Sequence, residues 1–154
     1  MNKPWINYFV QSFLAMVAIF VVLVMLSLQH IVIVASIGAS AFIVFTMPRS
    51  VTARPRNVIG GHIIGFVSGS LCWYVGLFFP QTEPIITSAM YSLAVGLSIL
   101  LMVITDMEHP PASGTALATA INGFSFKILL ALIISTCVLS IIKHVLKPYL
   151  KDLV

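Results

Sequence analysis

Between Pro4 and Pro48 the chain contains no Asp, Glu, Lys or Arg, and most of this run is apolar. One helical crossing of a bilayer takes roughly 20 residues, so the run is long enough for two crossings. The whole chain is 60% hydrophobic and 8% charged, whereas soluble domains carry roughly 25% charged residues. The sequence therefore predicts an integral membrane protein.

The net charge of +4 does not indicate a nucleic-acid partner, because basic residues beside apolar spans are expected on topological grounds. Cys72 and Cys137 both lie inside apolar runs, where cysteine behaves as a small hydrophobic residue. We expect no nucleic-acid binding, no disulfide framework, no cofactor and no bound metal.

Polar interruptions divide the chain into membrane segments. Long helices are predicted over about 8–28, 58–79, 85–104 and 128–146, and a shorter segment over about 31–47. Gln29 and His30 form the break between the first long helix and the shorter segment. With a second short segment after the double proline, the expected fold is all-α, with four long transmembrane helices and two short or broken ones.

The stretch from Thr105 to Asn122 places charged residues and two prolines between long apolar runs. Pro110 and Pro111 lack a backbone N–H and restrict the residues before them, so the incoming helix should end near Asp106. Pro at the first helical position is favoured, so a new helix should begin at once. Its first N–H groups, at Ala112, Ser113 and Gly114, would then suit an anion. The alternative is a kinked membrane helix with a polar connection.

Two similar segments of small residues lie about 75 residues apart in the chain, Gly38-Ala39-Ser40 and Ser113-Gly114-Thr115. Each small-residue segment follows one long span and precedes another. Matched short segments in two halves of a transporter indicate a site near the middle of the membrane. We therefore predict one transmembrane domain over residues 1–154, built as two inverted pseudo-repeats over about 1–80 and 84–154.

The distribution of basic residues tests the number of crossings. Six crossings put Lys3, the loop after Pro48 and the C-terminal lysines on one side, as the positive-inside rule requires. Four crossings with two re-entrant segments would put that loop opposite Lys3 and Lys151. We favour six crossings, with both termini cytoplasmic in a bacterial inner membrane. The loop contains Arg49, Arg54 and Arg56.

Three motifs occur in a fixed order: SIGASA at 36–41, PRNVIGGH at 55–62 and HPPASGTA at 109–116. With them the chain resembles the HPP family of small integral membrane proteins over roughly residues 30–125. The family is usually described with four spans. Members in photosynthetic lineages are linked to nitrite transport, so the resemblance implies a small inorganic anion as substrate, most notably nitrite.

The expected substrate path combines polar donors with small residues and the two prolines. Arg56 is the expected fixed positive charge, His62 and His109 are the titratable donors, and the path should be narrowest at Gly38 and Gly114. The predicted path residues are Ser36, Gly38, Ser40, Arg56, Asn57, His62, His109, Pro110, Pro111, Ser113, Gly114 and Thr115.

Three other functions fit parts of the sequence. A structural or accessory membrane subunit would explain the small size and the small-residue faces. A metal-dependent membrane enzyme would use the histidines and acidic residues near the double proline, but the chain contains no HExxH and no repeated histidine box. A proton-coupled cation carrier would use Asp106 or Glu108. We expect a non-enzymatic transporter or channel.

A regular glycine spacing predicts close helix packing. Gly61, Gly65 and Gly69 follow each other at four-residue steps and share nearly one helix face. We expect this face to join copies of the chain in a homo-oligomer, and the alternative is that it packs within one subunit.

Overall fold

The computed structural model describes residues 5–26, 31–80 and 82–154, and within them the chain is helical and contains no strand. The predicted all-α fold with four long and two short helices is confirmed. The break at Gln29 and His30, and Lys3, lie outside the described residues. The helices are α1 Trp5–Leu26, α2 Ile31–Thr46, the 3-10 helix Val51–Ala53, α3 Pro55–Gly76, α4 Pro84–Ile104, α5 Pro111–Asn122 and α6 Phe126–Leu146.

Proline begins three of these helices, because its fixed φ suits the first helical position and its missing N–H would have no helical partner there. Pro55, Pro84 and Pro111 are the first residues of α3, α4 and α5. α4 ends with Asp106 in the left-handed region at φ 52. The Met107 N–H then donates to the Met102 carbonyl at 2.9 Å, which closes the helix end. The chain therefore turns sharply into the double proline.

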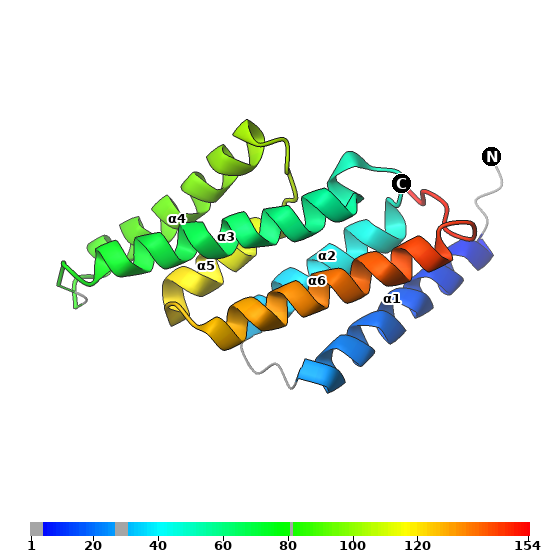
Figure 1. Ribbon diagram of the computed structural model, residues 1–154, viewed down its shortest axis with the longest axis horizontal. Helices are drawn as coiled ribbons and strands as arrows, with labels where there is room; N and C mark the ends of the chain where they lie inside the picture. Colours follow the sequence, from blue (N-terminus) through cyan, green and yellow to red (C-terminus); the bar gives the residue numbers. More distant parts are fainter. Residues whose placement is uncertain (1–4, 27–30, 81) are drawn as a thin grey trace.

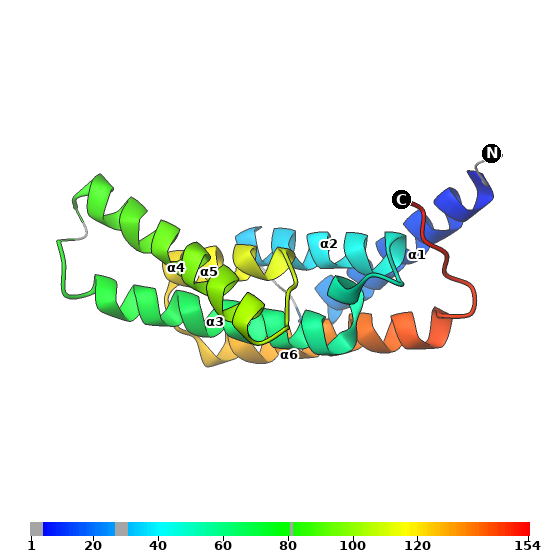
Figure 2. The same cartoon turned by 90° about the horizontal axis from the view of Figure 1, so that it is seen from above.

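The six α-helices of the described residues form two halves. Each half contains a long helix, a short helix and a second long helix, in that order. Their lengths are 22, 16 and 22 residues for α1 to α3 and 21, 12 and 21 residues for α4 to α6. α3 and α6 run antiparallel through the middle, α4 lies toward one end and α1 toward the other (Figure 1). The short helices α2 and α5 meet on one side of the α3 and α6 pair (Figure 2).

Four helices, α1, α3, α4 and α6, are long and apolar enough to cross a membrane. α1 and α4 are the least covered of these and expose large apolar side chains along their length. Such surfaces are costly in water and suited to lipid, so they indicate the lipid-facing sides of the bundle. Examples are Phe9 at 74% exposed, Phe20 at 65%, Ile85 at 83% and Ile104 at 67%.

The glycine face of α3 packs against α5 within the chain. A Cβ at Gly65 would lie 2.3 Å from the Ala112 carbonyl oxygen, and one at Gly69 would lie 2.3 Å from the Ala116 carbonyl oxygen. Only glycine permits this backbone contact. The face is therefore covered internally and is not free for a second copy. The expected homo-oligomer loses this support and stays a prediction.

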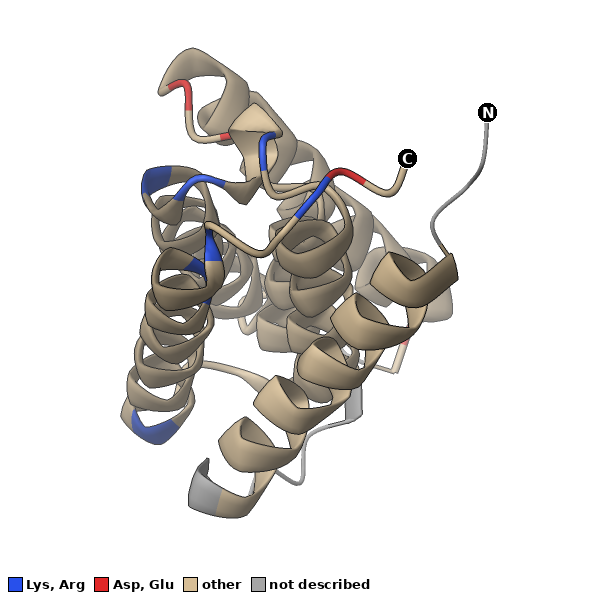
Figure 3. Ribbon diagram, turned by 90° about the vertical axis from the view of Figure 1, so that its right-hand side faces the viewer, with Lys and Arg blue, Asp and Glu red and all other residues tan. Residues whose placement is uncertain are grey.

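The start of α1, the loop after α2 and the C-terminal segment lie together at one end. The Gln11 amide donates to the carbonyls of Phe45 and, at 2.8 Å, Lys151. The Leu153 N–H donates to the Thr46 carbonyl at 2.8 Å, and Arg49 forms an ion pair with Asp152 at 3.8 Å. Lys and Arg positions gather at this end (Figure 3). The loop that contains Arg49, Arg54 and Arg56, here called the arginine loop, thus lies beside the C-terminal segment. The arrangement with four crossings, which would put this loop on the opposite side, is therefore wrong.

Replacing Gly65 by Ala should lower the stability of the folded protein by about 1–3 kcal/mol, because the added methyl group would overlap the α5 backbone. Gly96→Ala is the matched control, since a Cβ at Gly96 meets no atom within 4 Å. The midpoint of thermal unfolding in a mild detergent should fall for Gly65→Ala and not for Gly96→Ala. Equal midpoints would show that α3 and α5 are not in backbone contact.

Cysteine labelling should place the loop after α2 and the C-terminal segment on one membrane face. In a chain with Cys72 and Cys137 replaced by Ala, the variants Val51→Cys and Tyr149→Cys should react alike with an impermeant thiol reagent in intact cells. Thr82→Cys, in the loop between α3 and α4, should react from the other face. Different accessibility of the Val51 and Tyr149 positions would contradict the arrangement.

Candidate functional site

A buried polar cluster lies where the two small-residue segments meet. Ser36 and Ser40 come from α2, His62 from α3, His109 from the loop before α5, and Thr115 from α5. Their side chains are 4%, 0%, 1%, 0% and 0% exposed, respectively. The sequence predicted that these segments meet, and the structure brings all five predicted residues together.

Short hydrogen bonds connect the cluster. The His109 ring contacts the Thr52 carbonyl oxygen through Nδ1 at 2.8 Å and the Ser40 hydroxyl through Nε2 at 2.8 Å. The His62 ring contacts the Ser40 hydroxyl through Nε2 at 2.8 Å and the Thr115 hydroxyl through Nδ1 at 2.7 Å. Each imidazole therefore has both nitrogens occupied by partners inside the protein.

The partners fix the direction of these bonds. The Thr52 carbonyl can only accept, so His109 carries a proton on Nδ1. In neutral His109 the Nε2 atom must then accept, and the Ser40 hydroxyl donates to it. The Ser40 oxygen in turn accepts from the Nε2–H of His62, which leaves Nδ1 of His62 as an acceptor for Thr115. With both rings neutral, every donor points the same way.

The chain of hydrogen bonds continues to α2 at its other end. The Ser36 hydroxyl lies 2.9 Å from the Thr115 hydroxyl and 2.6 Å from the Pro111 carbonyl oxygen. Ser36 has one proton and the Pro111 carbonyl can only accept, so Ser36 donates to the Thr115 oxygen only when its bond to Pro111 is released. One continuous path therefore runs from Ser36 through Thr115 and His62 to Ser40.

A second arrangement of the same atoms accepts one more proton. The Ser40 hydroxyl also lies 3.0 Å from the Ser36 carbonyl oxygen. If Ser40 donates there, its oxygen can accept from Nε2–H of His62 and Nε2–H of His109 together, which requires His109 to be protonated on both nitrogens. The cluster thus has two arrangements that differ by one proton.

Two predicted path residues lie outside this cluster. Arg56 is exposed and its guanidinium donates to the Thr105 carbonyl oxygen at 2.9 Å. Asn57 is buried, and its amide donates to the Glu108 carbonyl oxygen at 3.2 Å. Both side chains therefore hold the loop that carries His109. Arg56 does not place a fixed charge in the cluster.

The prediction of free N–H groups at the start of α5 is wrong for two of the three residues, Ala112 and Ser113. The Ala112 N–H donates to the His109 carbonyl at 2.8 Å, and the Ser113 N–H donates to the Pro110 carbonyl at 3.1 Å. The reason is that Pro110 itself adopts helical angles, φ −50 and ψ −40, so the first turn closes on itself. The double proline shapes the turn and does not offer an open anion site.

Gly114 faces Ser36 of α2 and not Gly38. A Cβ at Gly114 would lie 3.4 Å from the Ser36 Cβ, whereas a Cβ at Gly38 meets no atom within 4 Å. The prediction is therefore corrected for Gly38, because an added side chain there would meet no neighbouring atom.

A cavity of about 190 Å³ reaches the cluster from the crevice between α4 and the start of α5. Three predicted path residues, His109, Pro110 and Ser113, line it together with Glu108 and apolar side chains of α4. His109 therefore connects this cavity to the buried hydrogen bonds. In the described part of the chain, no three His, Cys, Asp or Glu side chains gather closely enough to hold a metal ion.

Sequence reasoning missed Thr52, whose carbonyl oxygen orients His109. The contribution comes from the backbone, so residue type carries no signal for it. It used the C-terminal lysines only to assign the topology, whereas Lys143 is 7% exposed and donates to the Ala53 carbonyl oxygen at 2.5 Å. A charged residue inside the last apolar run was the available signal.

The family profile of the HPP transmembrane region matches residues 2–151. The chain belongs to the HPP transmembrane family. Two transmembrane proteins of Dictyostelium discoideum are similar to it. One is 42% identical over 92 residues, covering 60% of this chain and 31% of the relative. The other is 37% identical over 89 residues, covering 58% of this chain and 27% of the relative.

The matches to these relatives span less than a third of each relative's own length. No solved structure matches the chain. In this HPP protein the turn that connects α4 to α5 is formed by His109, Pro110 and Pro111. The resemblance of the sequence to the family rested in part on this motif.

Replacing Ser40 by Ala should destabilise the protein by roughly 1–3 kcal/mol, because both imidazole rings lose a buried partner. Ser135→Ala is the matched control. Ser135 is also fully buried, but its hydroxyl donates at 2.6 Å to the Ala131 carbonyl of its own helix. Thermal unfolding in mild detergent should show the larger loss for Ser40→Ala, and equal losses would mean that Ser40 does not connect the two rings.

Proposed function

We propose that this HPP protein is a transporter or channel for a small inorganic anion, with nitrite as the leading candidate. The observation that carries the proposal is the buried cluster of two imidazoles and three hydroxyls between α2, α3 and α5. Polar groups within a membrane are costly, and they are retained where a solute or a proton passes. The proposal is for a protein that moves a solute and not for an enzyme.

The chemistry of the cluster favours an anion over a cation. Its side chains are imidazoles and hydroxyls that can donate hydrogen bonds, and no carboxylate takes part in the described contacts. A hydroxyl can turn its proton from a protein acceptor toward a solute without any movement of the helix. An anion that has lost part of its water could therefore be held by Ser36, Ser40 and Thr115.

The two proton arrangements of the cluster support coupling to a proton. A monovalent anion that enters with one proton carries no net charge across the membrane. In the proposal, His109 takes the proton while Ser40 turns its own hydroxyl proton toward the Ser36 carbonyl. Asp106 and Glu108 are not needed as proton sites, because they lie in the loop outside the cluster.

We further propose that the arginine loop and both termini are cytoplasmic in a bacterial inner membrane. The support is the distribution of charge, since basic residues gather at one end of the bundle (Figure 3), whereas the start of α6 contributes Lys127 alone. Such a basic end also raises the local concentration of anions.

The test is flux into vesicles that contain only the purified protein. Nitrite should enter faster than in protein-free vesicles. His109→Gln should lower the rate of nitrite entry by roughly tenfold or more, because a buried hydrogen bond of a side chain that can carry a proton is lost. His144→Gln is the matched control, since His144 is exposed on α6 and lies outside the cluster. Nitrate, chloride and bicarbonate should be measured alongside to define the selectivity.

Two outcomes would redirect the proposal. If folded protein moves no anion, the structural or accessory subunit is favoured. If it moves a cation and Glu108→Gln stops that movement, the proton-coupled cation carrier replaces the anion transporter. Equal rates for His109→Gln and the wild type would place the path away from the cluster.

A further inference from the structure

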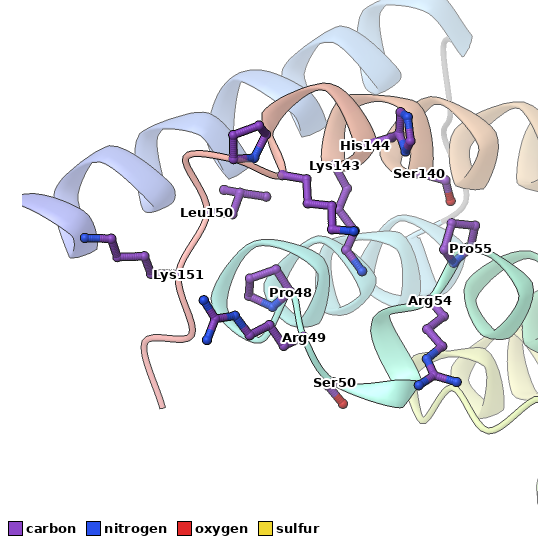
Figure 4. A pocket seen from close by; sticks show the side chains of 12 residues that line it. Pro48, Arg49, Ser50, Arg54, Pro55, Ser140, Lys143, His144, Leu150 and Lys151 are labelled. Atoms are coloured by element: carbon purple, nitrogen blue, oxygen red, sulfur yellow. The ribbon is translucent and has the colours of Figure 1, made fainter.

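A second, larger cavity of about 760 Å³ lies between the arginine loop, the end of α6 and the C-terminal segment (Figure 4). None of the residues that line it belongs to the buried polar cluster of Ser36, Ser40, His62, His109 and Thr115, here called the histidine cluster. Its basic lining residues are Arg49, Arg54, Lys143, His144, Lys147 and Lys151.

The charge of this basic pocket is almost entirely of one sign. Among the described residues that line it, none is Asp or Glu. Asp152 lies beside it and pairs with Arg49 at 3.8 Å, which leaves the other cations without a carboxylate partner in the described ion pairs. Like charges gathered in one cavity repel each other, so an anion bound among them would be stabilising.

Lys143 gives the pocket a fixed donor. Its side chain is 7% exposed, and Nζ donates to the Ala53 carbonyl oxygen at 2.5 Å. An ammonium group has three N–H donors, so this bond uses one of them. The bond holds the ammonium at the arginine loop while other donors stay available to a ligand.

Ser140 gives a second and independent sign of a ligand. It is 7% exposed, and its buried hydroxyl has no hydrogen-bond partner within the described chain. Ser135 and Thr136 on the same helix instead donate to carbonyls one turn back, at 2.6 and 2.8 Å. Ser140 lines the pocket one turn before Lys143, and both side chains extend from α6 toward the arginine loop (Figure 4). A buried hydroxyl without a hydrogen-bond partner is energetically unfavourable unless a bound ligand supplies that partner.

We propose that the basic pocket binds a phosphate group, carried either by an anionic lipid headgroup or by soluble inorganic phosphate. A phosphate has several acceptor oxygens in a tetrahedral arrangement, so it can accept from Lys143, Ser140, Arg54 and Lys147 together. A small monovalent anion would leave most of the cations uncompensated. The pocket also lies at the ends of the membrane helices, where lipid headgroups are found.

This inference does not depend on the proposed transport function. Transport was proposed for the histidine cluster between α2, α3 and α5, whereas the pocket is lined by the loop after α2, the end of α6 and the C-terminal segment. Binding is measured without any flux, so the two proposals can fail separately.

The experiment measures binding to the purified full chain in a mild detergent by calorimetry and thermal unfolding. One arm adds inorganic phosphate at constant ionic strength, with sodium chloride as the balancing salt. The other arm adds short-chain phosphatidylglycerol, with short-chain phosphatidylcholine as the comparison whose phosphate is offset by choline. The variants are Lys147→Gln and Ser140→Ala, neither of which disturbs the bond between Lys143 and Ala53. Lys127→Gln, at the opposite end of the same helix, is the matched control.

Binding should weaken about tenfold or more in Lys147→Gln and measurably in Ser140→Ala, and stay unchanged in Lys127→Gln. Binding of inorganic phosphate would identify the soluble source, and binding of phosphatidylglycerol alone would identify the headgroup. The proposal is overturned if neither ligand binds, if Lys147→Gln and Ser140→Ala bind as the wild type does, or if Lys127→Gln loses as much affinity as Lys147→Gln.

Discussion

The backbone contact between α3 and α5 is the constraint on which the other features of this structure depend. Gly65 and Gly69 allow the carbonyls of Ala112 and Ala116 to approach closer than any side chain would permit. Because α3 belongs to the first half of the chain and α5 to the second, this contact joins the halves. It also sets His62 on α3 beside His109 at the start of α5, with ring centroids 5.2 Å apart.

The polar cluster shows how buried polar groups are tolerated inside a bundle with an apolar exterior. Each imidazole nitrogen has a partner, and the chain of hydrogen bonds ends at two carbonyl oxygens that can only accept, those of Thr52 and Pro111. Ser40 has one proton and three possible partners, which makes it the point where the arrangement can change. A single proton separates the two arrangements of this network.

Most of the basic side chains gather at one end of the molecule. The arginine loop, the last turn of α6 and the C-terminal segment gather the basic groups at one end, and the contacts of Gln11 and Asp152 hold this end together. The histidine cluster touches this end through the bond from His109 to the Thr52 carbonyl, but the cluster itself contains no Arg or Lys. The basic end and the cluster therefore have different chemistry, one suited to a multiply charged group and the other to a small solute with a proton.

The sequence by itself determined the membrane class, the four long and two short helices, and the sharp turn at the double proline. These follow from apolar run length and from the fixed φ of proline, which are local properties. It also predicted that Ser36, Ser40, His62, His109 and Thr115 share a site, because small residues and isolated polar residues in apolar runs mark close contacts. The tertiary structure decided the rest. Whether the glycine face packs inside the chain, whether Arg56 reaches the site, and which carbonyl orients His109 depend on distances between segments far apart in sequence. The closed first turn of α5 likewise depends on backbone angles that residue identity alone does not fix.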